Sequence, residues 1–124
     1  MKDFIKIILF AACLGFIFYF SSLPASSINS DFVANYDYLC HFAEYFVLAF
    51  LGFSLIKKKK QSFRSIFIIV FLLLWAISDE YHQSFVFGRD ASLRDLFVDW
   101  LAIIVAGWFY FKVWTKIKKK INLR

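Results

Sequence analysis

The sequence predicts an all-α integral membrane protein, a four-helix bundle whose N and C termini are both cytoplasmic. The 124-residue chain is 61% hydrophobic and 23% aromatic, far above the usual share for a soluble protein of one domain. The apolar runs at 4–20 and 65–78 lack the polar face that a soluble amphipathic helix shows every 3.6 residues. Basic residues gather in short blocks between these runs. We therefore expect helices that face lipid.

Four segments approach the roughly 20 helical residues that are needed to span about 30 Å of hydrocarbon. We predict helices at about 2–20, 39–56, 65–85 and 93–114, within one transmembrane domain of residues 1–124. The first run also fits a cleavable signal peptide, because a basic start precedes it and small residues follow it. Cys13 and Cys40 lie at different depths, so they suggest neither a disulfide nor a pair of metal ligands.

The segments between these helices differ in chemistry. Residues 21–37 include Pro24 and several turn-forming residues but no Lys or Arg, so we expect a loop or a short surface helix. Residues 57–64 form a short basic turn. The run from Lys57 to Lys60 is interpreted as a topology anchor. A specific role in binding anionic lipid is the alternative, since any such run attracts acidic lipid headgroups.

The basic blocks set the predicted orientation. They lie at 2–6, 57–64 and 112–124, which is one side of a bundle with an even number of helices. Because cytoplasmic loops are enriched in Lys and Arg, we expect a multi-pass protein with residues 21–37 and 79–92 outside. The net charge of +6 does not indicate nucleic-acid binding, since the basic blocks flank apolar spans and no reading element presents them. Membrane lipid is the expected partner, and the oligomeric state is not predicted.

Polar residues recur at helical spacing near the expected outer ends of three helices. Residues at spacing i, i+4 or i+7 share one helical face. Three sets follow this spacing: the first is Asp37, His41 and Glu44, the second is Asp79 and Gln83, and the third is Asp95 and Asp99. Glu80 lies beside the second set. An ionisable group at the centre of a spanning helix costs about 2.5 to 3.5 kcal/mol on insertion scales. We therefore expect these side chains to face the bundle or a water-filled cavity.

The residue types suggest a polar site with separate roles. Gly88 allows a tight reversal, and the forked donors of Arg89 suit a phosphate or carboxylate. Ser92 is expected to cap the fourth helix by accepting from the amide of Arg94 or Asp95. The candidate acid–base residues are His41, Glu44, Asp79 and Glu80, and the candidate binding residues are Arg89, Gln83, Tyr45, Asp95 and Asp99. The acids and histidines show no diagnostic metal spacing, so we expect no metal and no cofactor.

Several of these residues form a pattern that resembles the VanZ-like family of small bacterial membrane proteins. The resemblance runs from about Tyr19 to Gly107, and it is carried by "FSSLP", by "DYLCHFAEYFVLAFLG" and by "DEYHQSFVFGRDASLRDLFVDWLA". The matching positions are Asp37, His41, Phe42, Tyr45, Asp79, Glu80, Gln83, Phe85, Gly88, Arg89, Ser92 and Asp95. The chain departs from the pattern where Tyr38 replaces a common Lys, Phe87 replaces a proline and Asp99 replaces an Asn.

The resemblance implies a bacterial cytoplasmic-membrane protein linked to resistance to the glycopeptide teicoplanin. With the residues above, it suggests that an anionic amphiphile or a lipid-linked precursor binds, or is modified, at the outer leaflet. Whether the protein is an enzyme is left open. The main alternative is a structural or partner-binding bundle, in which Arg89 pairs with Asp79 or Asp95, and His41 with Glu44 or Tyr45, only to lock the helices. Ion transport is disfavoured because the first and third helices supply no polar residues in their inner halves.

Overall fold

The chain is helical, as the sequence predicts. The computed structural model describes residues 2–27, 30–56 and 61–122. Its elements are α1 (Lys2–Ser21), the short 3₁₀ helix η1 (Ala25–Ser27), α2 (Ser30–Ser54), α3 (Gln61–Gln83), α4 (Leu93–Phe109), the π-helical segment η3 (Tyr110–Trp114) and α5 (Thr115–Asn122). No strand occurs in these described ranges. The all-α class is therefore confirmed.

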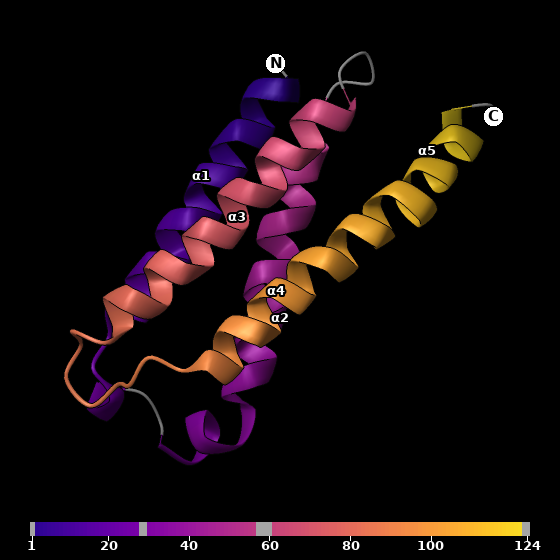
Figure 1. Cartoon of the computed structure of the whole chain (residues 1–124). Coiled ribbons are helices and arrows are strands. Elements are labelled where there is room, and N and C mark those ends of the chain that lie inside the picture. Colours follow the sequence, from indigo (N-terminus) through magenta and orange to yellow (C-terminus); the bar gives the residue numbers. More distant parts are fainter. Residues whose placement is uncertain (1, 28–29, 57–60, 123–124) are drawn as a thin grey trace.

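The four long helices run alongside one another (Figure 1). In this view α1 and α3 lie side by side, α2 lies behind, and the continuous path from α4 through η3 to α5 diverges toward the C terminus. The most extensive packing is between α2 and α4, and α1 contacts both α2 and α3. Both termini lie at one end of the bundle, together with the end of α2 and the start of α3. The α1–α2 and α3–α4 connections lie at the other end.

The surface of the bundle is apolar, as expected for helices that face lipid. Large side chains such as Phe4, Phe67, Leu74 and Ile104 are exposed. Among the described residues, two helical stretches are long and apolar enough to cross a membrane, Asp3–Ser21 and Leu93–Val113. The fully buried core is small by comparison; it consists of Ile17, Tyr45, Leu48, Ala49, Phe53, Leu72, Ala76, Ala102, Ile103 and Ala106.

Small residues allow α2 and α4 to approach closely. Ala102 and Ala106 of α4 are completely buried. A Cβ atom added at Gly107 would lie 3.2 Å from two atoms of the Phe53 ring. Helices in lipid associate through this kind of close packing, because no hydrophobic effect drives them together there. The small residues of α4 thus keep its polar face near α2.

The helix ends differ from the predicted ones in two places. The second helix begins at Ser30 rather than near residue 39, and helical structure continues past residue 114 as α5. Both extensions lie beyond the apolar runs. Hydropathy marks where a helix meets hydrocarbon, whereas helix formation depends on backbone propensity, and Ser and Asp at 30–31 favour a helix start. The third helix covers 61–83 instead of 65–85, which is close to the uncertainty of helix ends.

The loop around Gly88 joins the two connections at one end of the bundle. Gly88 has a φ of 76°, a left-handed conformation that glycine adopts without steric cost. Its Cα faces Ala25, because an added Cβ would lie 3.2 Å from the Ala25 Cβ. The amide of Ala25 donates to the carbonyl oxygen of Phe87 at 3.3 Å. The predicted reversal at Gly88 is confirmed, and it positions Arg89 beside the segment that follows α1.

Candidate functional site

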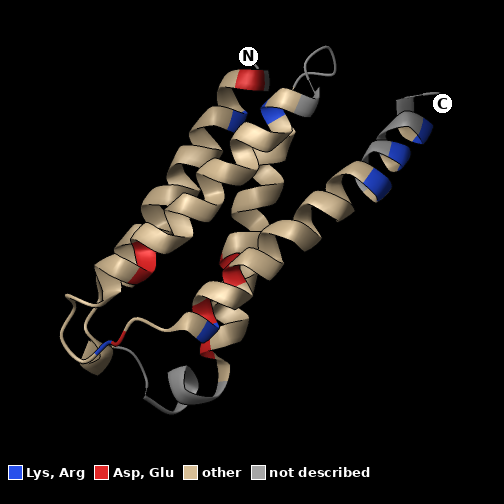
Figure 2. Ribbon diagram, in the orientation of Figure 1, with Lys and Arg blue, Asp and Glu red and all other residues tan. Residues whose placement is uncertain are grey.

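Charged residues separate along the bundle. In Figure 2, most Lys and Arg lie toward the end that carries both termini, whereas most Asp and Glu lie toward the opposite end, together with Arg89 and Arg94. The buried polar residues are Ser21, His41, Asp79, Glu80, Gln83 and Asp99. They come from α1, α2, α3 and α4. We call His41, Tyr45, Asp79, Glu80, Gln83, Arg89, Ser92, Asp95 and Asp99 the polar cluster.

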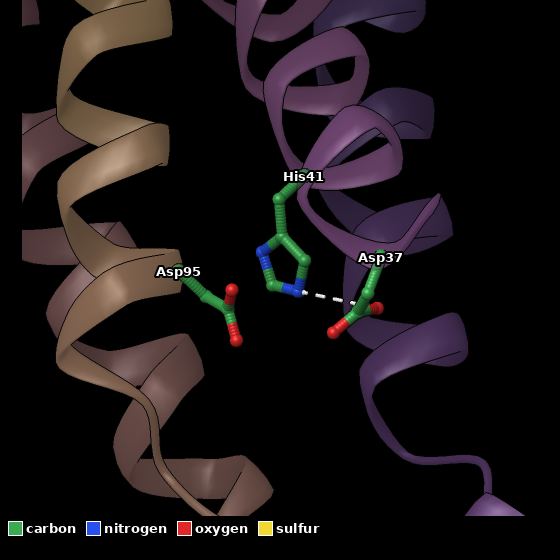
Figure 3. A group of neighbouring side chains, drawn as sticks. All are labelled: Asp37, His41 and Asp95. Atoms are coloured by element: carbon green, nitrogen blue, oxygen red, sulfur yellow. Dashed lines mark ion pairs between the residues drawn. The ribbon is translucent and has the colours of Figure 1, made fainter. Parts of the chain in front are cut away.

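His41 is the link between α2 and α4. Its Nδ1 atom forms a 3.1 Å hydrogen bond with Oδ1 of Asp99, and Asp99 is completely buried. Its Nε2 atom lies 4.0 Å from Oδ1 of Asp37, one turn earlier on α2. Figure 3 shows the imidazole ring between Asp37 on its own helix and Asp95 on α4. Acidic groups on two helices therefore surround one histidine.

A second set of hydrogen bonds connects α2, α3 and the α3–α4 loop. Oδ2 of Asp79 accepts from the Tyr45 hydroxyl and from Nε2 of Gln83, each at 3.3 Å. Oε1 of Gln83 accepts from Nη1 of Arg89 at 3.2 Å. Nε of Arg89 donates to the Leu23 carbonyl oxygen at 3.1 Å. This chain of contacts runs from the buried Tyr45 to a partly exposed guanidinium.

Glu80 connects α3 to the start of α4. Its Oε2 atom accepts from the Ser92 amide at 2.8 Å, while the Ser92 hydroxyl accepts from the Asp95 amide at 3.2 Å. Ser92 is thus the N-cap of α4, as predicted, and satisfies one amide that the helix leaves free. Oε1 of Glu80 is buried and makes no hydrogen bond with any described residue.

Asp99, like Glu80, has one carboxylate oxygen without a hydrogen-bond partner among the described residues. Oδ2 of Asp99 is buried and has no hydrogen-bond partner within the described part of the chain. A buried acceptor without a partner loses its hydration without compensation, at a cost of about 1 to 3 kcal/mol. Two such oxygens on neighbouring acids indicate a site that favours positive charge.

Eight of the nine predicted site residues fall into three groups. His41 meets Asp99, with Asp95 nearby, whereas Tyr45, Asp79, Gln83 and Arg89 form one hydrogen-bonded chain. Glu80 is bonded to the Ser92 amide. The ninth, Glu44, lies on α2 near His41 and is half-buried; within the described ranges it forms no hydrogen bond or ion pair. The convergence of three helices is as predicted.

The hydrogen-bond partners within the polar cluster differ from the pairs that we expected if these residues only hold the helices together. Arg89 contacts Gln83 and a backbone carbonyl rather than Asp79 or Asp95, and His41 contacts Asp99 rather than Glu44 or Tyr45. Residues one turn apart share a helical face, so spacing favours Glu44 as the partner of His41. The packing of α4 against α2 instead brings Asp99 to the ring.

Sequence reasoning missed two contributions from the segment after α1. The Leu23 carbonyl holds Arg89, and the Ser22 hydroxyl lies 3.0 Å from Nε2 of His82. The His82 ring also stacks on Phe18, with centroids 4.7 Å apart. Residues 21–37 were expected to be a loop or a short helix. Every residue has a backbone carbonyl, so the sequence does not show which carbonyl accepts a hydrogen bond from Arg89. His82 therefore joins α1 to α3 outside the polar cluster.

The pocket at the other end has a different character. It has a volume of about 380 Å³ and lies where α1, the end of α2 and the start of α3 meet, lined by Phe10, Leu55, Ile56, Arg64, Phe67, Ile68 and Phe71. Its lining is almost wholly apolar. It offers space for an acyl chain but no acid–base chemistry, so the polar cluster remains the candidate functional site.

Comparison with known proteins identifies a family. A family model described as "Predicted membrane protein (DUF2238)" matches residues 2–81, more than half of the chain. The match includes His41, Glu44, Tyr45, Asp79 and Glu80 and ends before the α3–α4 loop. No curated protein matches the chain, and no solved structure does. The resemblance to the VanZ-like family remains a prediction.

Proposed function

Because the chain belongs to the family of predicted membrane proteins DUF2238, we propose that it is a multi-pass protein of the bacterial cytoplasmic membrane that binds an anionic amphiphile at the outer leaflet. The ligand chemistry is that of a phosphate-bearing lipid or lipid-linked cell-wall precursor. The VanZ-like family, which the chain resembles, is linked to teicoplanin resistance, and in this proposal binding of the amphiphile contributes to such resistance. Catalytic modification of the ligand is a further step that His41, Glu44, Asp79 and Glu80 would carry.

The position of Arg89 is the observation that carries this proposal. Its Nε and Nη1 atoms are held by Leu23 and Gln83, so the guanidinium is fixed at the edge of the polar cluster. It is only partly buried. A guanidinium has five N–H donors in a planar fork that matches phosphate oxygens. Arg89 can therefore contact a headgroup while the acyl chains remain in lipid.

The acids of the polar cluster limit where an anion binds. Asp79, Glu80 and Asp99 are buried beside one histidine, and like charges would repel a bare phosphate among them. A headgroup is therefore placed on the loop side of Arg89. The role of Gln83 in this arrangement is to orient the guanidinium. Asp79 orients Gln83, and the Tyr45 hydroxyl holds Asp79.

A conservative substitution tests the role of Arg89. Arg89→Lys keeps the charge but loses the fork, so about tenfold less anionic lipid should co-purify with the protein, since a charge-assisted hydrogen bond contributes about 1.5 to 3 kcal/mol. Arg94→Lys is the matched control, because Arg94 is exposed in the first turn of α4, at the same end of the bundle, and does not belong to the polar cluster. Lipid bound to each purified protein is measured by mass spectrometry. Equal amounts of anionic lipid on Arg89→Lys and wild type would refute the proposal.

Drug susceptibility gives an independent readout in cells. Wild-type protein should lower teicoplanin susceptibility relative to an empty vector, and Arg89→Lys at the same membrane level should not. The alternative, a bundle whose charges only hold the helices together, has one structural observation in its favour: Asp79 of α3 accepts a hydrogen bond from Tyr45 of α2 and thereby joins these two helices. It predicts a lower melting temperature for Arg89→Lys with unchanged lipid content and unchanged susceptibility.

A further inference from the structure

We propose that His41, Glu80 and Asp99 bind one divalent transition-metal ion, Zn²⁺ or Mn²⁺, between α2, α3 and α4. Each of the three residues offers one ligand atom, and these atoms lie within 4.8 Å of one another. All three residues are buried. The metal site does not depend on the amphiphile, since none of its ligands is Arg89.

The geometry needs only small side-chain movements to hold a metal. Zinc bonds of about 2.0 to 2.2 Å to nitrogen and oxygen place neighbouring ligand atoms about 3.4 Å apart in a tetrahedral site. Nδ1 of His41 and Oδ1 of Asp99 are already 3.1 Å apart. Three protein ligands leave one position for a non-protein ligand.

The unpartnered oxygens are the second, independent observation. Asp99 is 0% exposed and Glu80 is 5% exposed, yet Oδ2 of Asp99 and Oε1 of Glu80 have no hydrogen-bond partner among the described residues. The other oxygen of each carboxylate is already bonded, to His41 and to the Ser92 amide respectively. Two buried carboxylates with spare lone pairs are costly unless a cation neutralises them.

Neighbouring groups supply the support that metal ligands usually have. A metal-bound histidine commonly directs its other ring nitrogen toward a carboxylate, and Nε2 of His41 lies 4.0 Å from Asp37 (Figure 3). The Ser92 amide fixes one oxygen of Glu80. One imidazole and two carboxylates suit Zn²⁺ or Mn²⁺ better than Mg²⁺ or Ca²⁺, which prefer oxygen ligands alone.

A second trio shares His41, and the test must separate the two. Asp37, His41 and Asp95 also place ligand atoms within 4.8 Å of one another. Asp37 and Asp95 are partly exposed, however, and neither has a buried oxygen without a partner. A partly hydrated carboxylate has less need of a cation. The buried trio is therefore the proposed site.

Metal titration of the full-length protein in detergent tests the site. After chelation and desalting, wild type should bind one Zn²⁺ per chain by calorimetry, and Zn²⁺ should raise its melting temperature. Asp99→Asn and Glu80→Gln should each weaken binding by about 100-fold or more, since loss of a supporting residue alone costs 10- to 100-fold. Asp90→Asn is the matched control, because Asp90 is exposed in the loop before α4.

Each result decides for or against the proposal. Saturable binding by wild type and Asp90→Asn, with the loss in both ligand variants, supports it. The proposal is overturned if the wild-type protein binds Zn²⁺ and Mn²⁺ no better than Asp99→Asn does. This comparison does not depend on whether the other variants fold. A larger loss in Asp95→Asn than in Glu80→Gln would assign the ion to the other trio. Arg89→Lys should still bind metal, which separates this result from the amphiphile experiment.

Discussion

Individual residues in the loop before α4 have clear local causes. Gly88 reverses the chain with a positive φ, Arg89 follows it, and Ser92 caps α4 while its amide holds Glu80. Gly88 thus positions the guanidinium of Arg89, and Ser92 both caps α4 and holds the carboxylate of Glu80. The loop is part of the candidate site and not only a connection.

Gly88→Ala should destabilise the protein by about 1 to 2 kcal/mol, the cost of a left-handed conformation for a residue with a Cβ. The added Cβ would also meet Ala25 at 3.2 Å. Gly15→Ala is the control, because a Cβ there meets nothing within 4 Å and alanine is the better helix former. Thermal unfolding in detergent measures both. A Gly88→Ala protein as stable as the Gly15→Ala protein would contradict this account of the loop.

The choice of partners could not be derived at the level of single residues. The sequence placed His41, Asp79 and Asp99 in the correct halves of their helices. It could not give the rotation of each helix about its axis, which decides whether His41 meets Glu44 or Asp99. That rotation depends on the packing of Ala102 and Ala106 of α4, both fully buried, and so on contacts far apart in sequence.

At the level of helices, the bond between His41 and Asp99 couples α2 to α4. In metal-free buffer, His41→Phe and Asp99→Leu should each destabilise the protein because each leaves a buried polar partner unsatisfied. The double variant should be more stable than the sum of the two effects by about 0.5 to 3 kcal/mol. Unfolding by denaturant in detergent measures all four proteins.

The control cycle pairs His41→Phe with Asp90→Leu, because Asp90 is exposed and lies in the loop. These two changes should add within about 0.5 kcal/mol. If the changes in unfolding free energy add as closely in the His41–Asp99 cycle as in the control cycle, no His41–Asp99 interaction couples the helices.

The apolar runs predicted the number of long helices and the start of α4 at residue 93, but not the ends of α2 and α4. The start of α2 at Ser30 and the continuation past residue 114 as α5 lie outside the apolar runs. Helical structure there does not require burial in hydrocarbon, so hydropathy carries no signal for it. The helix ends were therefore known only from the structure, whereas the all-α class could be predicted from the sequence.

For the whole molecule, the separation of charge in Figure 2 is the basis for its orientation. Lys6 and Arg64 lie at the end with both termini, and the polar cluster lies toward the other. Because basic residues favour the cytoplasmic side, the polar cluster faces outward in the proposed function. An even number of crossings is needed for this arrangement, although only two stretches of the described chain pass as spans on length and composition alone.

Labelling of single cysteines in intact cells tests this orientation most directly. In a protein with Cys13 and Cys40 changed to Ala, Asp90→Cys and Lys116→Cys place thiols at exposed positions of the α3–α4 loop and of α5. A membrane-impermeant maleimide should label residue 90 in intact cells and residue 116 only after the cells are permeabilised. Labelling of residue 116 in intact cells, or of residue 90 only after permeabilisation, would contradict an outward-facing polar cluster.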